Sequence, residues 1–164
     1  KLGRDGVDDT DPPALADAGC AGRLTALQET GDGRYLVTLT GISRFRVVEE
    51  LDVDTPFRQC RVTAEPFAVD FSESQGEDAV DRQKLLTTLR DFLEVNDMET
   101  DWDSINRAST ETLVNALSML SPYGPREKQA LLEAADLETR AEVLIAITEM
   151  ALARAGDEPG PSLQ

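Results

Sequence analysis

The spacing of apolar residues changes once along this 164-residue chain, and the change limits what the chain can fold into. Between residues 20 and 67 apolar and polar side chains alternate, as in strands with one buried face. From residue 75 to 155 apolar side chains recur at the spacing of one helix face. We therefore expect an α+β fold with a β region over 1–74, a helical region over 75–155 and a disordered tail over 156–164.

Four short antiparallel strands are predicted in the β region, after an aspartate-rich surface loop or frayed end over residues 1–18. The first strand is the β-prone run 21–29. The second places three apolar side chains on one face: Tyr35, Val37 and Leu39. Asp32-Gly33 between these runs indicates a hairpin, because glycine accepts the positive φ that the turn requires.

The third and fourth predicted strands continue the one-sided pattern. After Gly41 the third run places Phe45 and Val47 on one face, with Arg44 and Arg46 on the other. The fourth covers residues 57–65 and puts Cys60, Val62 and Ala64 on one face. Four such strands predict a meander that forms part of a small barrel.

Four helices are predicted in the helical region. A cap at Ser109 or Thr110 begins the second, which ends before Pro122. Pro125 suits the first turn of the third, and Asp136 is expected to cap the fourth. The first helix carries this apolar stripe: Leu85, Leu86, Leu89, Phe92 and Leu93.

Charge argues against two classes of partner. The chain has 32 acidic and 16 basic residues, a net charge of −16, and residues 75–164 contribute −10 of it. A strongly negative surface repels phosphates, so nucleic acid is an unfavourable partner, and it also repels anionic lipids. No run of 18 apolar residues is present, so no membrane-spanning helix is predicted.

The residue types exclude several kinds of active site. Without histidine there is no Ser-His-Asp triad, Cys-His dyad or histidine-containing zinc site. No phosphate-binding glycine loop is present, and no cofactor is expected. A Ser-Lys dyad would need Lys1, Lys84 or Lys128 in a desolvated pocket, but the last two lie on polar faces of predicted helices.

The two cysteines, Cys20 and Cys60, are forty residues apart and form no C-x-x-C pair. They predict neither a disulfide framework nor a zinc site. We expect two small buried hydrophobic side chains in a reducing environment, and therefore a cytoplasmic protein.

A cluster of alternating carboxylates lies within the polar stretch 96–108. A calcium loop beginning at Asp97 would need glycine at its sixth position and glutamate at its twelfth, where this chain has Trp102 and Ala108. We therefore expect a solvated loop between two helices. The cluster consists of Asp97, Glu99, Asp101 and Asp103.

Three apolar residues of the helical region are candidates for peptide binding. Trp102 either pins the loop to the helices or forms an exposed binding anchor. Met119 and Tyr123 lie at the proline turn that ends the second helix. Such a turn can expose an apolar side chain to a partner, although the aromatic ring more often folds back onto the helix ends.

Two arginines of the third predicted strand are further candidates. Arg44 and Arg46 share one strand face and could bind a peptide carboxylate or a nucleic-acid backbone. Alternatively, the arginines of this sheet pair across strands with acids such as Glu49 and Glu65.

Two segments carry a family resemblance. Residues 19–67 contain a glycine-bearing strand, a hairpin, the pattern v-x-l-x-G-x-x-R-F-r-v from Val37 to Val47, and a strand ending at Pro66. Residues 113–152 contain a helix, a proline turn, a KQALLE helix and an R-x-x-x-L helix. In this order they resemble the N-terminal domain of Lon proteases, and more closely the stand-alone bacterial proteins built on that domain.

The resemblance implies a PUA-like antiparallel β pseudo-barrel packed on a C-terminal helical bundle, without catalytic residues. The family's opening strands have no counterpart before Lys1. We expect those strands to be supplied by residues not represented in this chain or by another chain. A closed sheet formed by residues 20–67 alone would contradict that expectation.

Three functions follow, and the leading one is a non-catalytic module that binds unfolded or client polypeptide, as the resemblance implies. The alternative is a PUA-like domain that binds RNA or a small ligand, which the net charge of −16 opposes. The third is a hydrolase with an unrecognised carboxylate or Ser-Lys site.

Overall fold

The computed structural model describes residues 13–72 and 75–157. It has an α+β fold in which a three-stranded antiparallel sheet precedes the helices, and the class predicted from the sequence is confirmed. The chain divides into two compact units between Pro66 and Phe67, here called the β unit and the helical unit. Residues 1–12 of the predicted loop and residues 158–164 of the predicted tail lie outside the described residues. Residues 156 and 157, also predicted to belong to the tail, are part of the last helix.

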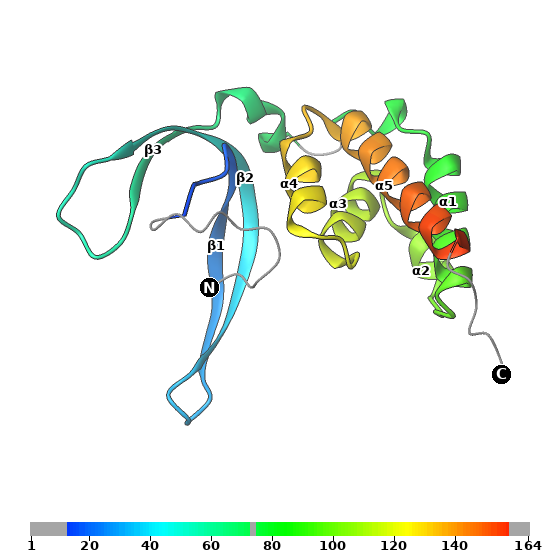
Figure 1. Ribbon diagram of the computed structural model, residues 1–164, viewed down its shortest axis with the longest axis horizontal. Coiled ribbons are helices and arrows are strands. Elements are labelled where there is room, and N and C mark those ends of the chain that lie inside the picture. The colour runs from blue at the N-terminus through cyan, green and yellow to red at the C-terminus, as the bar shows by residue number, and fades with distance from the viewer. Residues whose placement is uncertain (1–12, 73–74, 158–164) are drawn as a thin grey trace. The chain divides into compact units, whose positions relative to one another are not determined.

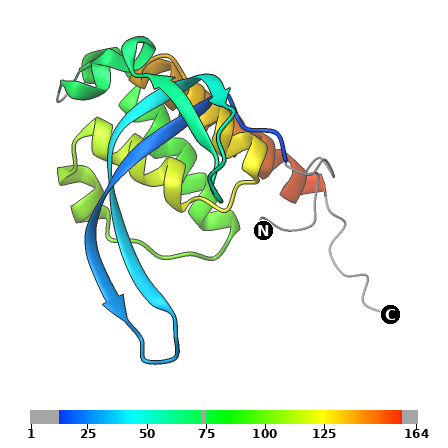
Figure 2. The same ribbon diagram turned by 90° about the vertical axis from the view of Figure 1, so that its left-hand side faces the viewer.

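The sheet of the β unit has the order β1-β2-β3, with strands Ala18–Glu29, Tyr35–Leu51 and Gln59–Thr63. Figures 1 and 2 show β1 and β2 running together as a long curved hairpin. The prediction of four strands is wrong, because the second and third form one continuous strand. Gly41 does not break β2: the register shifts there by one residue, which leaves Ile42 as a β-bulge opposite Ala21 and Gly22.

The hairpin turn lies where the Asp32-Gly33 pair predicts it. Gly31 and Gly33 have φ angles of 80° and 81°, a backbone region that side chains with a Cβ rarely adopt. The Thr30 amide donates to the Arg34 carbonyl oxygen over 3.0 Å and closes the turn. The Asp32 carboxylate accepts from the Thr30 hydroxyl, and this hydrogen bond lowers the pKa of Asp32.

Two 3₁₀ helices, Glu65–Phe71 and Glu77–Ala79, lead into the helices of the second unit. Three predicted helix starts are confirmed: Ser109 accepts from the Thr112 amide, Pro125 occupies the first turn, and Asp136 accepts from the Thr139 amide. The helices are α1 Arg82–Val95, α2 Trp102–Arg107, α3 Thr110–Leu120, α4 Pro125–Glu133 and α5 Leu137–Asp157.

The short helix α2 lies inside the stretch predicted to be a loop. Asp101 begins it by accepting hydrogen bonds from the Asp103 and Ser104 amides. One of the clustered carboxylates therefore serves as a helix cap, since such a side chain satisfies amides that have no intrahelical partner.

The core of the helical unit surrounds α5, which packs against α1, α3 and α4. Val114 on α3 is fully buried at 0 % exposure, and Tyr123 packs against the same cluster. A helix that contacts three neighbours needs a wide apolar face. The buried cluster is Val80, Leu85, Val114, Leu131, Leu137, Ala141, Leu144, Ile145 and Ile147.

The β unit has almost no buried apolar residues of its own. Among the buried apolar residues in the described part of the chain, only Ala18 belongs to residues 13–66. No helix within the described residues is long and apolar enough to cross a membrane.

Candidate functional site

The β1–β2 hairpin has one strongly apolar face. Residues opposite each other in an antiparallel pair lie on the same face, and the register pairs Leu24 with Leu39 and Leu27 with Val37. Tyr35, two residues before Val37 on β2, extends this face. The exposed fractions of these five side chains run from 46 % for Val37 to 65 % for Leu39. We call this set the hairpin face.

A β-bulge at Thr25 is the reason that Leu24 and Leu27 share this face. Residues three apart on a regular strand point to opposite sides, but the register skips Thr25 between Leu24 and Ala26. Thr25 lies on the opposite, polar face, where its hydroxyl lies 3.2 Å from that of Thr40. The hairpin is therefore amphipathic, although its apolar face is open to solvent.

The loop between β2 and β3 forms a second exposed apolar region. An open hollow of about 630 Å³ is lined by residues 50–53 and 55–58. Phe57 is 63 % exposed at this hollow, and Leu51 and Val53 beside it are also exposed. We call the hollow lined by residues 50–53 and 55–58 the loop hollow.

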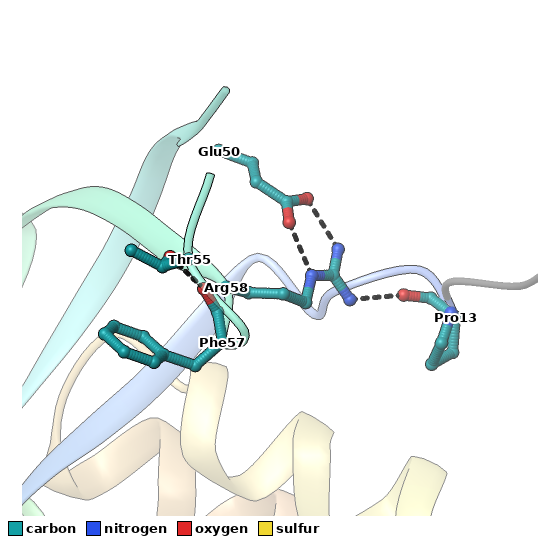
Figure 3. A network of polar contacts seen from close by, with 5 residues as sticks. All are labelled: Pro13, Glu50, Thr55, Phe57 and Arg58. Atoms are coloured by element: carbon teal, nitrogen blue, oxygen red, sulfur yellow. Dashed lines mark hydrogen bonds and ion pairs between the residues drawn. The ribbon is translucent and has the colours of Figure 1, made fainter. Parts of the chain in front are cut away.

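Arg58 fixes the base of the loop hollow. Its Nε and Nη2 atoms donate to the two carboxylate oxygens of Glu50 at 2.5 Å each, and Nη1 donates to the Pro13 carbonyl oxygen at 2.6 Å. Figure 3 shows this network, with the Phe57 ring pointing away from the ion pair. The Thr55 hydroxyl donates to the Phe57 carbonyl oxygen over 2.7 Å and tightens the turn before it.

Glu50 and Arg58 shift each other's pKa. Hydrogen bonds from Arg58 lower the pKa of the Glu50 carboxyl, and Glu50 raises the pKa of Arg58. A two-point guanidinium–carboxylate pair also fixes the relative orientation of both groups. The pair therefore restricts the loop that presents Phe57.

The two candidate arginines of β2 differ in environment. Arg44 is buried at 4 % exposure, although the strand pattern predicts an exposed polar face, whereas Arg46 is exposed. Strand alternation predicts only which face a side chain occupies, and burial of that face depends on what covers it. Arg61 on β3 forms an ion pair with Glu49 of β2, one of the acids expected to pair across the strands.

The three candidates of the helical unit differ in environment. Trp102 is half-buried, and the Arg90 guanidinium lies 4.8 Å from its ring centroid. The Tyr123 hydroxyl lies 2.6 Å from that of Thr148 on α5, so its ring folds back onto the core. Met119 is 69 % exposed at the end of α3. Whether any of them contacts a ligand stays a prediction.

The two cysteines and the two lysines of the helical unit have the following surroundings. Cys20 is exposed, so the prediction of two buried cysteines is wrong for it, and Cys60 is partly buried. Cys20 lies on β1 opposite Arg44, where strand alternation alone does not determine burial. Lys84 pairs with Glu149 over 3.3 Å, and Lys128 Nζ donates to the Met119 carbonyl oxygen over 2.9 Å.

The carboxylate cluster of residues 97–103 is used for local structure. Ser104 donates to the Asp101 carboxylate through its hydroxyl and its amide, and these hydrogen bonds lower the pKa of Asp101. Asp97 has a φ of 52° just after α1. Across residues 13–72 and 75–157, no three histidine, cysteine or carboxylate side chains gather closely enough to hold a metal ion.

Comparison with known families identifies the family of this chain. Residues 3–149 match the model of the substrate-binding domain of ATP-dependent protease La, or Lon. The chain belongs to this family. The resemblance of residues 19–67 and 113–152 to the N-terminal domain of Lon proteases is thereby confirmed, and the chain is a substrate-binding module of the Lon type. No curated protein matches the chain significantly.

Proposed function

We propose that this Lon-type domain binds unfolded or client polypeptide and performs no catalysis itself. The supporting observation is the exposed apolar surface of the β unit, in a chain whose family is defined by substrate binding. Contiguous exposed apolar side chains of this kind are typical of interaction sites. Membership in a family of substrate-binding domains supports the absence of catalysis. This proposal does not rest on the absence of any residue type.

The loop hollow is the proposed contact region for the client. Phe57 offers a large rigid side chain that contributes apolar contact area at little conformational cost, as aromatic anchors do at protein interfaces. Leu51 and Val53 extend its apolar surface. Because the Arg58–Glu50 pair restrains the loop, less ordering is needed when a client segment binds.

The sheet is proposed to be part of a PUA-like pseudo-barrel, and the helices are proposed to form a bundle. The support is the amphipathic hairpin: its apolar face has the composition of a barrel interior, yet it is exposed. In this proposal, strands supplied by residues not represented in this chain, or by another chain, cover the hairpin face. The loop hollow, which lies between β2 and β3, then remains available to the client.

The protein is expected in the cytoplasm, and nucleic acid is not expected to bind because the net charge is −16. RNA binding by the PUA-like fold is the second candidate. Its test is filter binding at low salt, where affinity driven by phosphate contacts is strongest.

The test of polypeptide binding uses a fluorescently labelled, reduced and carboxymethylated protein as a permanently unfolded client. Fluorescence anisotropy measures its affinity for the wild-type chain and for Phe57→Ala. Loss of an interface anchor typically costs about 1–2 kcal/mol, so we expect affinity to fall about 5- to 30-fold.

A matched control is available in the same chain. Phe71 is 65 % exposed, close to the 63 % of Phe57, but lies in the 3₁₀ helix Glu65–Phe71. Phe71→Ala is expected to bind the client like the wild type. If both variants lost the same affinity, the effect of Phe57→Ala would come from general surface hydrophobicity and not from the loop hollow. If the wild type did not bind the client, the proposed function would be refuted.

A further inference from the structure

A groove in the helical unit is separate from the hairpin face and the loop hollow. It has a volume of about 390 Å³ and runs between α5 and the segment where the 3₁₀ helix Glu77–Ala79 leads into α1. Figure 1 shows α1 and α5 next to each other, and the two helices are in contact. All of its lining residues belong to the helical unit.

The floor of this groove is apolar and built from small or branched side chains. Val80, Ala141 and Ile145 are buried and belong to or border the core cluster. Ala79 and Ala146 complete the floor and are exposed. Because alanine leaves space where a longer side chain would fill it, the groove can accept a small apolar group from a ligand.

The rim of the groove is acidic. It carries the carboxylates Asp81, Glu138, Glu142 and Glu149 and the single ammonium group of Lys84, a net charge of −3. Three of these five charges are engaged: Lys84 pairs with Glu149 over 3.3 Å, and Asp81 caps α1 by accepting from the Lys84 amide over 2.9 Å.

Glu138 and Glu142 are the charges that remain for a ligand. They are four residues apart on α5, so they lie on one helix face, and both are exposed. No cationic side chain in the described part of the chain lies within ion-pair distance of either. Like charges at this spacing destabilise a helix slightly, and a bound cation would relieve that repulsion.

We propose that this groove binds a polypeptide segment in which a lysine or arginine adjoins a small apolar side chain. The cation pairs with Glu138 and Glu142, while the apolar group occupies the space above Ala141 and Ile145. The choice of occupant rests on charge complementarity between the acidic rim and a basic segment. The inference deepens the proposed function, on which it rests, by naming the chemistry of one part of the client.

The test uses two labelled peptides, one with lysines on both sides of an Ala-Val pair and one with glutamates in place of the lysines. Anisotropy titrations of the full chain at low salt are expected to detect the lysine peptide only. The double variant E138Q/E142Q loses two exposed ion pairs with the ligand, so its affinity is expected to fall about tenfold. Raising the salt concentration is expected to weaken binding to the wild type more than to the variant.

Two further variants separate charge from folding. D91N/E94Q removes two exposed carboxylates of α1 outside the groove and is expected to bind like the wild type. Ala146→Phe fills the groove from an exposed position and is expected to abolish binding while the helical signal and melting temperature stay unchanged.

Several results would overturn the inference. They are equal affinity of E138Q/E142Q and wild type, equal binding of both peptides, or binding that Ala146→Phe leaves intact. Displacement of the lysine peptide by equimolar spermidine would assign the groove to free polyamines instead. If the unfolded client binds but groove variants have no effect, this inference fails and the proposed function stands. If no polypeptide binds at all, both fail.

Discussion

The two units of this protein use their apolar residues in opposite ways. The helical unit buries a continuous cluster around α5. The β unit leaves Leu24, Leu39 and Phe57 more than half exposed, and Ala18 is its one buried apolar residue within the described chain. Backbone hydrogen bonding and the alternation of apolar and polar side chains are sufficient to specify strands. A stable unit also needs a second element that covers the apolar face of its sheet.

The largest expected difference between the units is the ability to fold alone. A fragment of residues 67–164 keeps its whole core, so we expect a cooperative thermal transition by circular dichroism. A fragment of residues 1–66 has a three-stranded sheet with little buried apolar surface, and we expect no such transition. A sigmoidal melt from the second fragment would remove the contrast between the units.

Truncating a leucine in each unit sharpens the same contrast. Leu144 is 2 % exposed and Leu39 is 65 % exposed. Leu144→Ala is expected to lower the free energy of unfolding by about 3 kcal/mol, because it leaves a cavity in a packed core. Leu39→Ala is expected to cost less than about 0.5 kcal/mol. Urea unfolding of the full chain, followed by far-ultraviolet circular dichroism, measures both.

Hydroxyl hydrogen bonds provide a smaller comparison. The Tyr123 hydroxyl bonds to Thr148 in the helical unit, and the Thr25 hydroxyl bonds to Thr40 on the exposed polar face of the hairpin. Tyr123→Phe should lower the free energy of unfolding by about 1 kcal/mol, because it leaves the mostly buried Thr148 hydroxyl with one partner fewer. Thr25→Val should change it by less than about 0.5 kcal/mol, since water replaces the lost contact. Equal costs in urea titrations would contradict this ordering.

The smallest predicted effect is the response of the loop hollow to pH. Arg58 lowers the pKa of the Glu50 carboxyl below its ordinary value of 4.5. The contribution of this pair is therefore fully present above pH 4.5 and is lost as the pH falls through the lowered pKa. Carboxyl NMR titration of Glu50 should show Arg58→Gln returning the pKa towards 4.5. An unchanged titration curve in that variant would argue against the pairing.

Patterns that act within a few residues predicted most of the helical unit. Ser109, Pro125 and Asp136 begin their helices as expected, because capping depends on amides only two or three positions away. The helix α2 was missed. Its signal is Asp101 followed three residues later by Ser104, whereas the alternating carboxylates of this stretch predict a solvated loop.

The β unit was predicted less well, because bulges and burial depend on the partner strand. Nothing in residues 24–27 alone shows that Thr25 is skipped in the register, so strict alternation separates Leu24 from Leu27. The burial of Arg44 and the exposure of Cys20 could not be predicted for a related reason. The loop hollow was also missed, although Phe57 between Pro56 and Arg58 was the available signal.

The bulge at Thr25 has a consequence for self-association. An exposed apolar strand at the edge of a sheet can stack on a second copy of itself and begin aggregation. The bulge interrupts the ladder after Leu24, bends β1, and limits how far an edge-to-edge contact can extend without a break. Together with the repulsion between molecules of net charge −16, it favours a protein that stays dispersed at high concentration while its hairpin is uncovered.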